Sequence, residues 1–190
     1  YREILNLDPN HFQAADTLSR LQEAIEDWHS AVETMDRLVQ LNQDANARLE
    51  LLTRMGRIHF QKLEDWESAE RRLADALALD PGHVPALIVL AELYKARLDW
   101  LKAARTLQTA SECSTNSFER TNLAAEAGFI YLEELEDKNN ATAMFATAIT
   151  LDPEHVKVGK VLSRIYYEAE KFVLADPIFD MLARKSDQLE

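Results

Sequence analysis

The five histidines are the side chains of this sequence that most readily bind metal ions or transfer protons, and their spacing supports neither role. His11, His83 and His155 follow one another at intervals of 72 residues, and the sequence contains no H-x-x-x-H or C-x-x-C pair. Because the ligands of one metal ion must converge within a few ångströms, this spacing predicts no metal site. We interpret the histidines as residues of helix starts and helix packing, and we expect no cofactor.

Other catalytic signatures are also missing from the sequence. It has no glycine-rich phosphate loop and no G-x-S-x-G motif. Cys113 is the single cysteine, which excludes an intrachain disulfide, and we predict it to be a small buried apolar residue. The carboxylates Glu133, Glu134, Glu136 and Asp137 are interpreted as a solvated turn. The sequence therefore predicts a protein that is not an enzyme.

The composition favours an acidic, helical protein. Of the 190 residues, 47% are hydrophobic, and only four are glycine and five proline, too few for a turn-rich β fold. The formal net charge of −12 repels phosphate groups, so we expect no nucleic-acid partner. No apolar run approaches the roughly 18 to 20 residues that span a bilayer, which predicts no membrane insertion. The lack of disulfides favours the cytoplasm, and the start at Tyr1 leads us to expect further sequence before it.

The sequence repeats itself every 72 residues. The letters L-D-P-N-H at 7–11 recur as L-D-P-G-H at 79–83 and as L-D-P-E-H at 151–155. Trp28, Trp100 and Phe172 keep the same interval, as do Gly56 and Gly128. So many matches in one register indicate a structural repeat.

Each 72-residue unit divides into two pairs of helices. Apolar residues in 84–96 recur at the three-and-four spacing of an amphipathic helix, and Pro85 suits its first turn. Only three residues, 97–99, separate it from the next periodic segment, so the two helices must be antiparallel neighbours. We expect five such pairs, with helices starting near residues 10 and 27, 47 and 65, 83 and 99, 117 and 137, and 154 and 171.

This pattern resembles the tetratricopeptide repeat. In that family the first helix carries leucine, a small residue and then an aromatic residue, and the second helix carries alanines around a leucine or aromatic residue. The third pair fits with Leu90, Ala91 and Tyr94 in its first helix. The small residues at this position are expected where paired helices approach most closely, and they are Ser19, Gly56, Ala91, Gly128 and Ser163.

The resemblance implies an all-α fold, a right-handed α-solenoid of antiparallel helix pairs. We expect a single solenoid over residues 1–190, cut from a longer array, with 1–9 as the tail of a preceding repeat and repeats at about 12–45, 49–83, 84–117, 121–155 and 156–189. The glycine usual in the turn between paired helices is missing. Asp176-Pro177 falls inside the last helix, and we expect that helix to restart there, a kink being the alternative.

In tetratricopeptide repeats the first helices of successive pairs line a concave groove, which implies where partners bind. Applying that register, we expect a basic patch at Arg20, Arg54 and Arg57 and a second one that starts at Lys157. A groove of this kind suits an extended or helical peptide that carries acidic residues. The candidate partner-binding residues are Arg20, Arg54, Arg57, Phe60, Glu92, Lys95, Phe129, Lys157, Lys160, Arg164 and Tyr167.

The predicted function is a protein–protein interaction scaffold or adaptor that binds a partner peptide or helix without catalysis. Two alternatives stay open at this point. One is a substrate-presenting or regulatory region of a larger enzyme, and the other is a solenoid that self-associates through its open ends.

Overall fold

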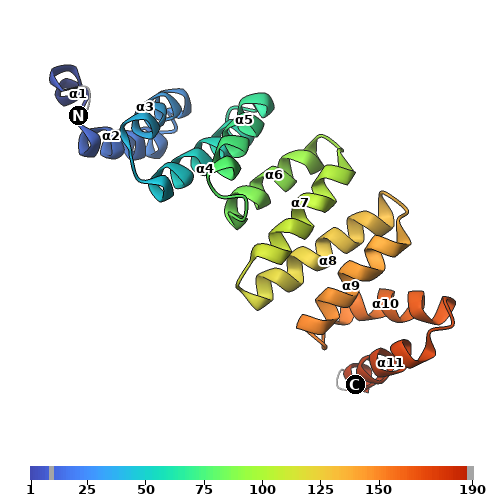
Figure 1. Cartoon of the computed structure of the whole chain (residues 1–190). Coiled ribbons are helices and arrows are strands. Elements are labelled where there is room, and N and C mark those ends of the chain that lie inside the picture. Colours follow the sequence, from blue (N-terminus) through green and yellow to red (C-terminus); the bar gives the residue numbers. More distant parts are fainter. Residues whose placement is uncertain (9–10, 188–190) are drawn as a thin grey trace. The chain divides into compact units, whose positions relative to one another are not determined.

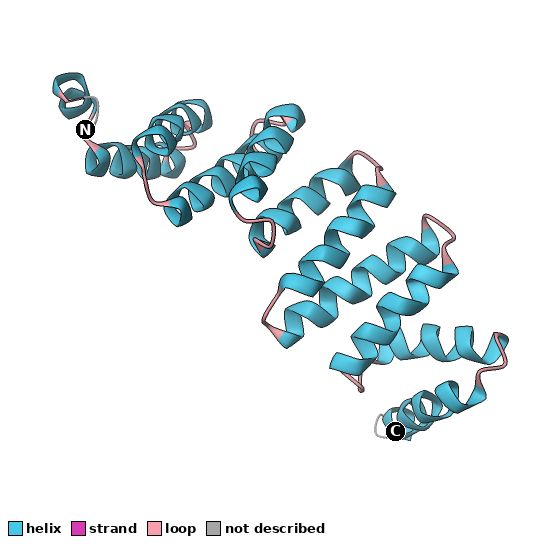
Figure 2. Cartoon of the chain, in the orientation of Figure 1, coloured by secondary structure: helices cyan, strands magenta, loops and turns pink. Residues whose placement is uncertain are grey.

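The computed structural model describes residues 1–8 and 11–187. Within these ranges the regular structure consists of helices alone, eleven in number (Figures 1 and 2). The predicted all-α solenoid of paired helices is therefore confirmed. Pro9, Asn10 and residues 188–189, which the sequence assigned to the first Asp-Pro turn and to the end of the last repeat, lie outside the described residues.

The chain forms two compact units, Tyr1–Leu93 and Tyr94–Glu190, and each is described by itself. The first unit contains α1 (Arg2–Leu7), α2 (Phe12–Ala24), α3 (Trp28–Leu41), α4 (Ala45–Gln61), α5 (Trp66–Leu79) and most of α6 (Val84–Ala96). The second contains the last turn of α6 and then α7 (Trp100–Cys113), α8 (Ser117–Glu133), α9 (Lys138–Leu151), α10 (Val156–Glu168) and α11 (Phe172–Asp187).

The helix boundaries reproduce the 72-residue period. Helix α2 starts at residue 12, α6 at 84 and α10 at 156, and all three have 13 residues. Helices α4 and α8 start at 45 and 117 and have 17 residues each. All ten paired helices start within two residues of the expected positions, and Pro85 is the second residue of α6, as predicted.

The second helices of the first four pairs begin at capping aspartates. The side chains of Asp27, Asp65, Asp99 and Asp137 each accept a hydrogen bond from the backbone N–H three residues on. These bonds satisfy donors that have no partner inside the helix. Hydrogen bonds from Ser68, from Lys102 and from Asn140 lower the pKa of Asp65, Asp99 and Asp137, respectively.

Two of the predicted small residues, Gly56 and Gly128, lie where paired helices approach closely, as the repeat pattern predicted. A Cβ on Gly56 of α4 would lie 2.6 Å from Cγ of Leu73 on α5, and a Cβ on Gly128 of α8 would lie 2.6 Å from Cε1 of Phe145 on α9. Ala91 is fully buried. A larger side chain at these positions would push the paired helices apart.

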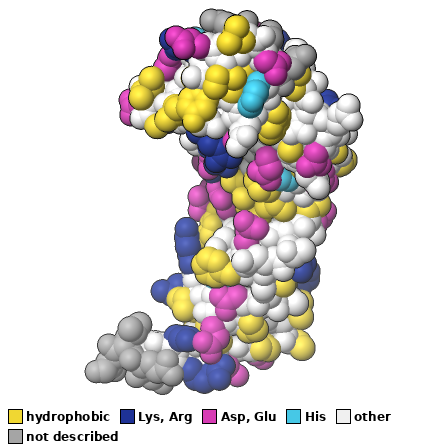
Figure 3. Space-filling view, turned by 90° about the vertical axis from the view of Figure 1, so that its left-hand side faces the viewer, with side chains coloured by type: hydrophobic (Ala, Val, Ile, Leu, Met, Phe, Trp, Pro, Cys, Tyr) yellow, Lys and Arg dark blue, Asp and Glu magenta, His cyan; other side chains and the backbone are white. Residues whose placement is uncertain are grey.

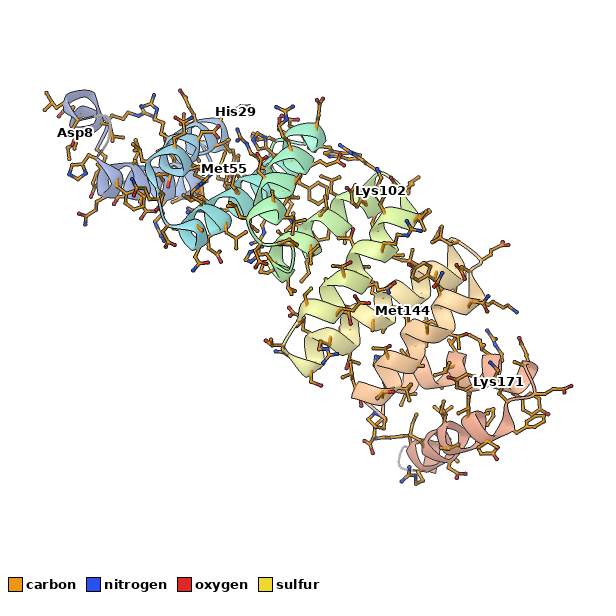
Figure 4. All side chains as sticks on the ribbon, in the orientation of Figure 1. Asp8, His29, Met55, Lys102, Met144 and Lys171 are labelled. Carbon is orange, nitrogen blue, oxygen red and sulfur yellow. The ribbon has the colours of Figure 1, made fainter. Side chains whose placement is uncertain are left out.

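The interior of the first unit is aliphatic and includes Met55, which is fully buried between the helices of the unit (Figure 4). In the second unit the interior contains the aromatic side chains of Phe145 and Tyr131 together with Leu107 and Leu162. Helices of this length are marginal in isolation, so burial of these stripes by neighbouring helices is what keeps them folded.

The turns inside the pairs adopt a conformation that usually favours glycine. In each turn, the residue two positions before the start of the second helix has a positive φ of 52° to 59°. The backbone adopts this left-handed conformation although none of the five residues is glycine. These residues are Glu26, Glu64, Leu98, Glu136 and Glu170.

Two sequence-based expectations are wrong. Helix α11 does not restart at Asp176, because it runs unbroken through Pro177. Pro177 is only the sixth residue of the helix, so its missing N–H removes one bond near the start, and the buried stripe of Ala175, Ile178 and Met181 holds the helix together. Cys113 is exposed rather than buried, since it is the last residue of α7.

Candidate functional site

The first helices of the first unit form a groove that gathers the predicted arginines. It has a volume of about 560 Å³ and lies along one face of α2 and one face of α4. We call it the arginine groove. Its lining consists of Phe12, Asp16, Arg20, Asn42, Ala47, Glu50, Leu51, Thr53, Arg54, Arg57 and Pro85.

The three arginines of this groove differ in how their charges are compensated. Arg20 donates from Nε to Oδ2 of Asp16 over 3.1 Å, and the guanidinium of Arg54 pairs with Glu23. Arg57 is exposed and has no ion pair within the described part of the chain. Of the three guanidinium groups in the groove, that of Arg57 is therefore the most available to bind an anion.

The other predicted residues of the first unit lie outside the arginine groove. Phe60 is half-buried and packs edge-on against Trp66, with 6.5 Å between ring centroids. Glu92 is also half-buried and accepts a hydrogen bond of 3.4 Å from Nε2 of Gln61. Both side chains contribute to packing between neighbouring helices.

In the second unit, α8 lines two adjoining hollows, and Asn122, His155 and Lys157 belong to the linings of both. Together we call them the α8 groove. The hollow toward the end of α8 has a volume of about 360 Å³, and the one toward its start about 600 Å³. The first is lined by Lys95, Trp100, Asn122, Ala125, Glu126, Phe129, Ile130, Glu133, Glu134, His155 and Lys157, and the second by Ser117, Phe118, Thr121, Asn122, Leu151, Asp152, His155, Val156 and Lys157.

Three predicted residues meet in the α8 groove. The ammonium group of Lys95 pairs with Glu126. Phe129 is half-buried against Phe145, and the Nζ of Lys157 stands 4.1 Å above the centroid of its ring. The groove therefore contains charges of both signs beside an aromatic floor.

Lys160, Arg164 and Tyr167 extend along α10 outside the linings of these two grooves. Lys160 and Arg164 are exposed, and neither has an ion pair among the residues that the structure describes. Tyr167 is 59% exposed and packs edge-on against Phe172 and Phe179. On the face of the molecule in Figure 3, basic, acidic and hydrophobic side chains are interspersed.

Several lining residues were not among the predicted site residues. Phe12 and Phe118 belong to the first turns of first helices, and Trp100 is the first residue of α7. Glu133 and Glu134 had been interpreted as a solvated turn. The sequence does contain a signal for some of them, since residues 118, 122, 125, 129 and 133 recur at the spacing of one helix face.

Two of the five histidines, His11 and His155, adopt the helix-start role that the sequence predicted. Nδ1 of His11 accepts a hydrogen bond of 3.1 Å from the N–H of Ala14, and Nδ1 of His155 accepts one of 3.3 Å from Val158. Burial lowers the pKa of His59. Among the described residues, no three histidine, cysteine or acidic side chains are grouped so as to hold a metal ion.

No helix within the described ranges is long and apolar enough to cross a membrane.

Comparison with known proteins agrees with the helix pairing. Residues 61–126 match the family model of the tetratricopeptide repeat. A crystal structure of MamA is similar with a TM-score of 0.63 at 15% identity, covering 93% of this chain and 92% of that one. MamA residues 41 to the end, from Desulfovibrio magneticus RS-1, give 0.56 at 18%, covering 93% and 96%. PilF of Pseudomonas aeruginosa gives 0.53 at 16%, covering 91% and 75%.

No curated protein sequence matches the chain. At identities this low the structural likeness concerns the fold alone. Residues 61–126 therefore match the tetratricopeptide repeat in sequence, and the 72-residue phase of the helices continues the same pairing on both sides of that segment. Stacked helix pairs of this kind form extended surfaces that suit the binding of other proteins.

Proposed function

We propose that this protein is a non-catalytic scaffold that binds an acidic segment of a partner protein in the arginine groove. The observation that carries the proposal is the gathering of Arg20, Arg54 and Arg57 in one groove of a chain whose net charge is −12. Guanidinium groups bind carboxylates with two parallel hydrogen bonds, and Arg57 is available for such a pair. Phe12, which is 44% exposed beside them, supplies an apolar contact of the kind that anchors peptides.

The proposal is tested by selecting ligands from a library of random peptides displayed on phage. The wild-type chain is expected to enrich peptides rich in aspartate and glutamate. A triple variant with Arg20, Arg54 and Arg57 replaced by glutamine should lose that enrichment, because the groove then has no cation left to pair with carboxylates.

A matched control separates the groove from the net charge of the protein. Replacing Arg37, Arg71 and Lys138 by glutamine removes three exposed cations from the second helices α3, α5 and α9. This variant should select the same peptides as the wild type. Equal loss in both variants, or enrichment that survives in the groove variant, would count against the proposal.

A second candidate function is self-association through the last helix pair. Val173 and Leu174 of α11 are 85% and 51% exposed, and the exposed ring of Phe172 lies beside them. Exposed apolar clusters of this kind often become interfaces. Sedimentation velocity over a range of concentrations tests the idea, and a monomer at every concentration would reject it.

A further inference from the structure

A straight row of side chains runs along α8 and lines the α8 groove from end to end. Phe118, Asn122, Ala125, Phe129 and Glu133 are spaced by four, three, four and four residues, which places them on one face of the helix. All five line one or both of the adjoining hollows. A chain segment bound there would therefore lie along α8 and meet different chemistry at each end.

The end of the groove at the C-terminus of α8 favours a cation. Glu133 and Glu134 are exposed, and neither has an ion pair within the described ranges, whereas the charge of Glu126 is compensated by Lys95. The last turn of α8 contains no basic residue, so the negative end of the helix dipole adds to the two carboxylates. Trp100 lines the same end and offers an aromatic surface, which attracts cations as well.

An internal cation already occupies part of this surface. The Nζ of Lys157 stands 4.1 Å above the centroid of the Phe129 ring, which is the geometry of a cation–π contact. The aromatic floor of the groove can therefore hold a positive charge. Lys157 also repels a second cation nearby, so its removal should strengthen the binding of a basic ligand.

The opposite end of the groove offers exposed apolar side chains beside polar ones such as Thr121 and Asp152. Phe118, in the first turn of α8, is 77% exposed, and Val156 of α10 lies in the same hollow. Between the two ends the amide of Asn122 is exposed, and such an amide can both donate to and accept from the backbone of an extended segment.

Helix geometry fixes the distance between the two ends. Fifteen residues separate Phe118 from Glu133, which corresponds to about 22 Å along the axis of α8. An extended chain covers that distance in about seven residues. We infer that the α8 groove binds an extended segment of a partner protein in which a basic residue and a large apolar residue lie about seven positions apart. The inference is independent of the acidic ligand proposed for the arginine groove.

The test uses fluorescein-labelled synthetic peptides and the whole chain, with binding measured by fluorescence anisotropy. Each peptide contains one arginine and one leucine joined by a spacer of serine and alanine, in both orders and at several separations. The tightest binding is expected at a separation of about seven residues. Exchanging the arginine for glutamate, or halving the separation, should weaken binding about tenfold.

Three variants locate the binding. Replacing Glu133 and Glu134 together by glutamine should weaken binding of the best peptide about tenfold, and Phe118→Ala should weaken it severalfold. Lys157→Gln should instead strengthen it two- to threefold, roughly the effect of one screened charge. A merely structural role of these residues would not produce a gain of affinity.

A control variant with Glu33 and Glu67 replaced by glutamine removes the same charge from α3 and α5, where both side chains are exposed, and should bind like the wild type. The inference is overturned if no peptide of the series binds, if the separation has no effect, or if the glutamate peptide binds more tightly and Lys157→Gln weakens it.

Discussion

The contact between Gly128 and Phe145 supports a quantitative prediction about helix pairing. A methyl group on residue 128 would lie 2.6 Å from Cε1 and 2.7 Å from Cδ1 of the Phe145 ring, about 1 Å closer than carbon atoms prefer. Phe145 is fully buried, so its ring has no free space to move into. Gly128→Ala gains about 1 kcal/mol of helix propensity, but the overlap costs about 1–3 kcal/mol. We expect a net loss of up to about 2 kcal/mol.

A double-mutant cycle separates the overlap from the propensity. Phe145→Ala removes the ring from the contact, so Gly128→Ala in that background should no longer clash and should become neutral or stabilising. The expected coupling between the two changes is about 1–3 kcal/mol, which is the cost of the overlap. Urea unfolding followed by circular dichroism measures all four proteins. Additive effects, or an equal loss in both backgrounds, would refute the reasoning that close approach of α8 and α9 is what requires glycine.

Three further predictions follow from the helix contacts, the caps and the turns. Ala91→Leu should overpack the buried surroundings of residue 91 and lower the free energy of unfolding by about 1–3 kcal/mol. An unchanged melting temperature would contradict this. Replacing Asp65, Asp99 and Asp137 by asparagine should keep the caps and leave the melting temperature at pH 7 nearly unchanged. The folded-state pKa of these aspartates lies below the usual value of 3.8, so their contribution to folding stability is complete above that pH and is lost as the pH falls through the lowered pKa. Because asparagine does not titrate, the triple variant should lose less stability than the wild type on acidification. Melting curves at decreasing pH will test this. Leu98→Gly should stabilise the protein by about 0.5–1 kcal/mol, because the left-handed conformation costs more for leucine than the extra chain entropy of glycine, and calorimetry showing a lower melting temperature would reject that explanation.

Most of the fold could be predicted because its determinants are local. The Asp-Pro turn at Asp80 ends α5, the 3.6-residue period of α6 follows, and the same letters return 72 residues later. The restart expected at Pro177 was wrong because the sequence shows where a backbone bond is lost but not how strongly packing compensates for it. That compensation comes from Ile178 and Met181, which are buried against other helices.

The candidate site was predictable in its position and less so in its chemistry. Spacing along α2 and α4 indicates that Arg20, Arg54 and Arg57 share a face, and they line one groove. It does not indicate that Arg54 pairs with Glu23 or that Lys157 covers the ring of Phe129. Those pairings depend on which side chains of neighbouring helices come within reach, and a single-helix pattern contains no such information.

The packing of each helix mainly against its neighbours in the chain has a consequence for folding. In the first unit α2 packs on α3, α3 on α4 and α4 on α5, and in the second α7, α8 and α9 follow the same rule. Contacts between residues close in sequence form with little loss of chain entropy, so each unit should fold on a fast timescale. Amide hydrogen exchange should then proceed by the opening of single helix pairs, and α1, a helix of six residues that packs on α2, should exchange first.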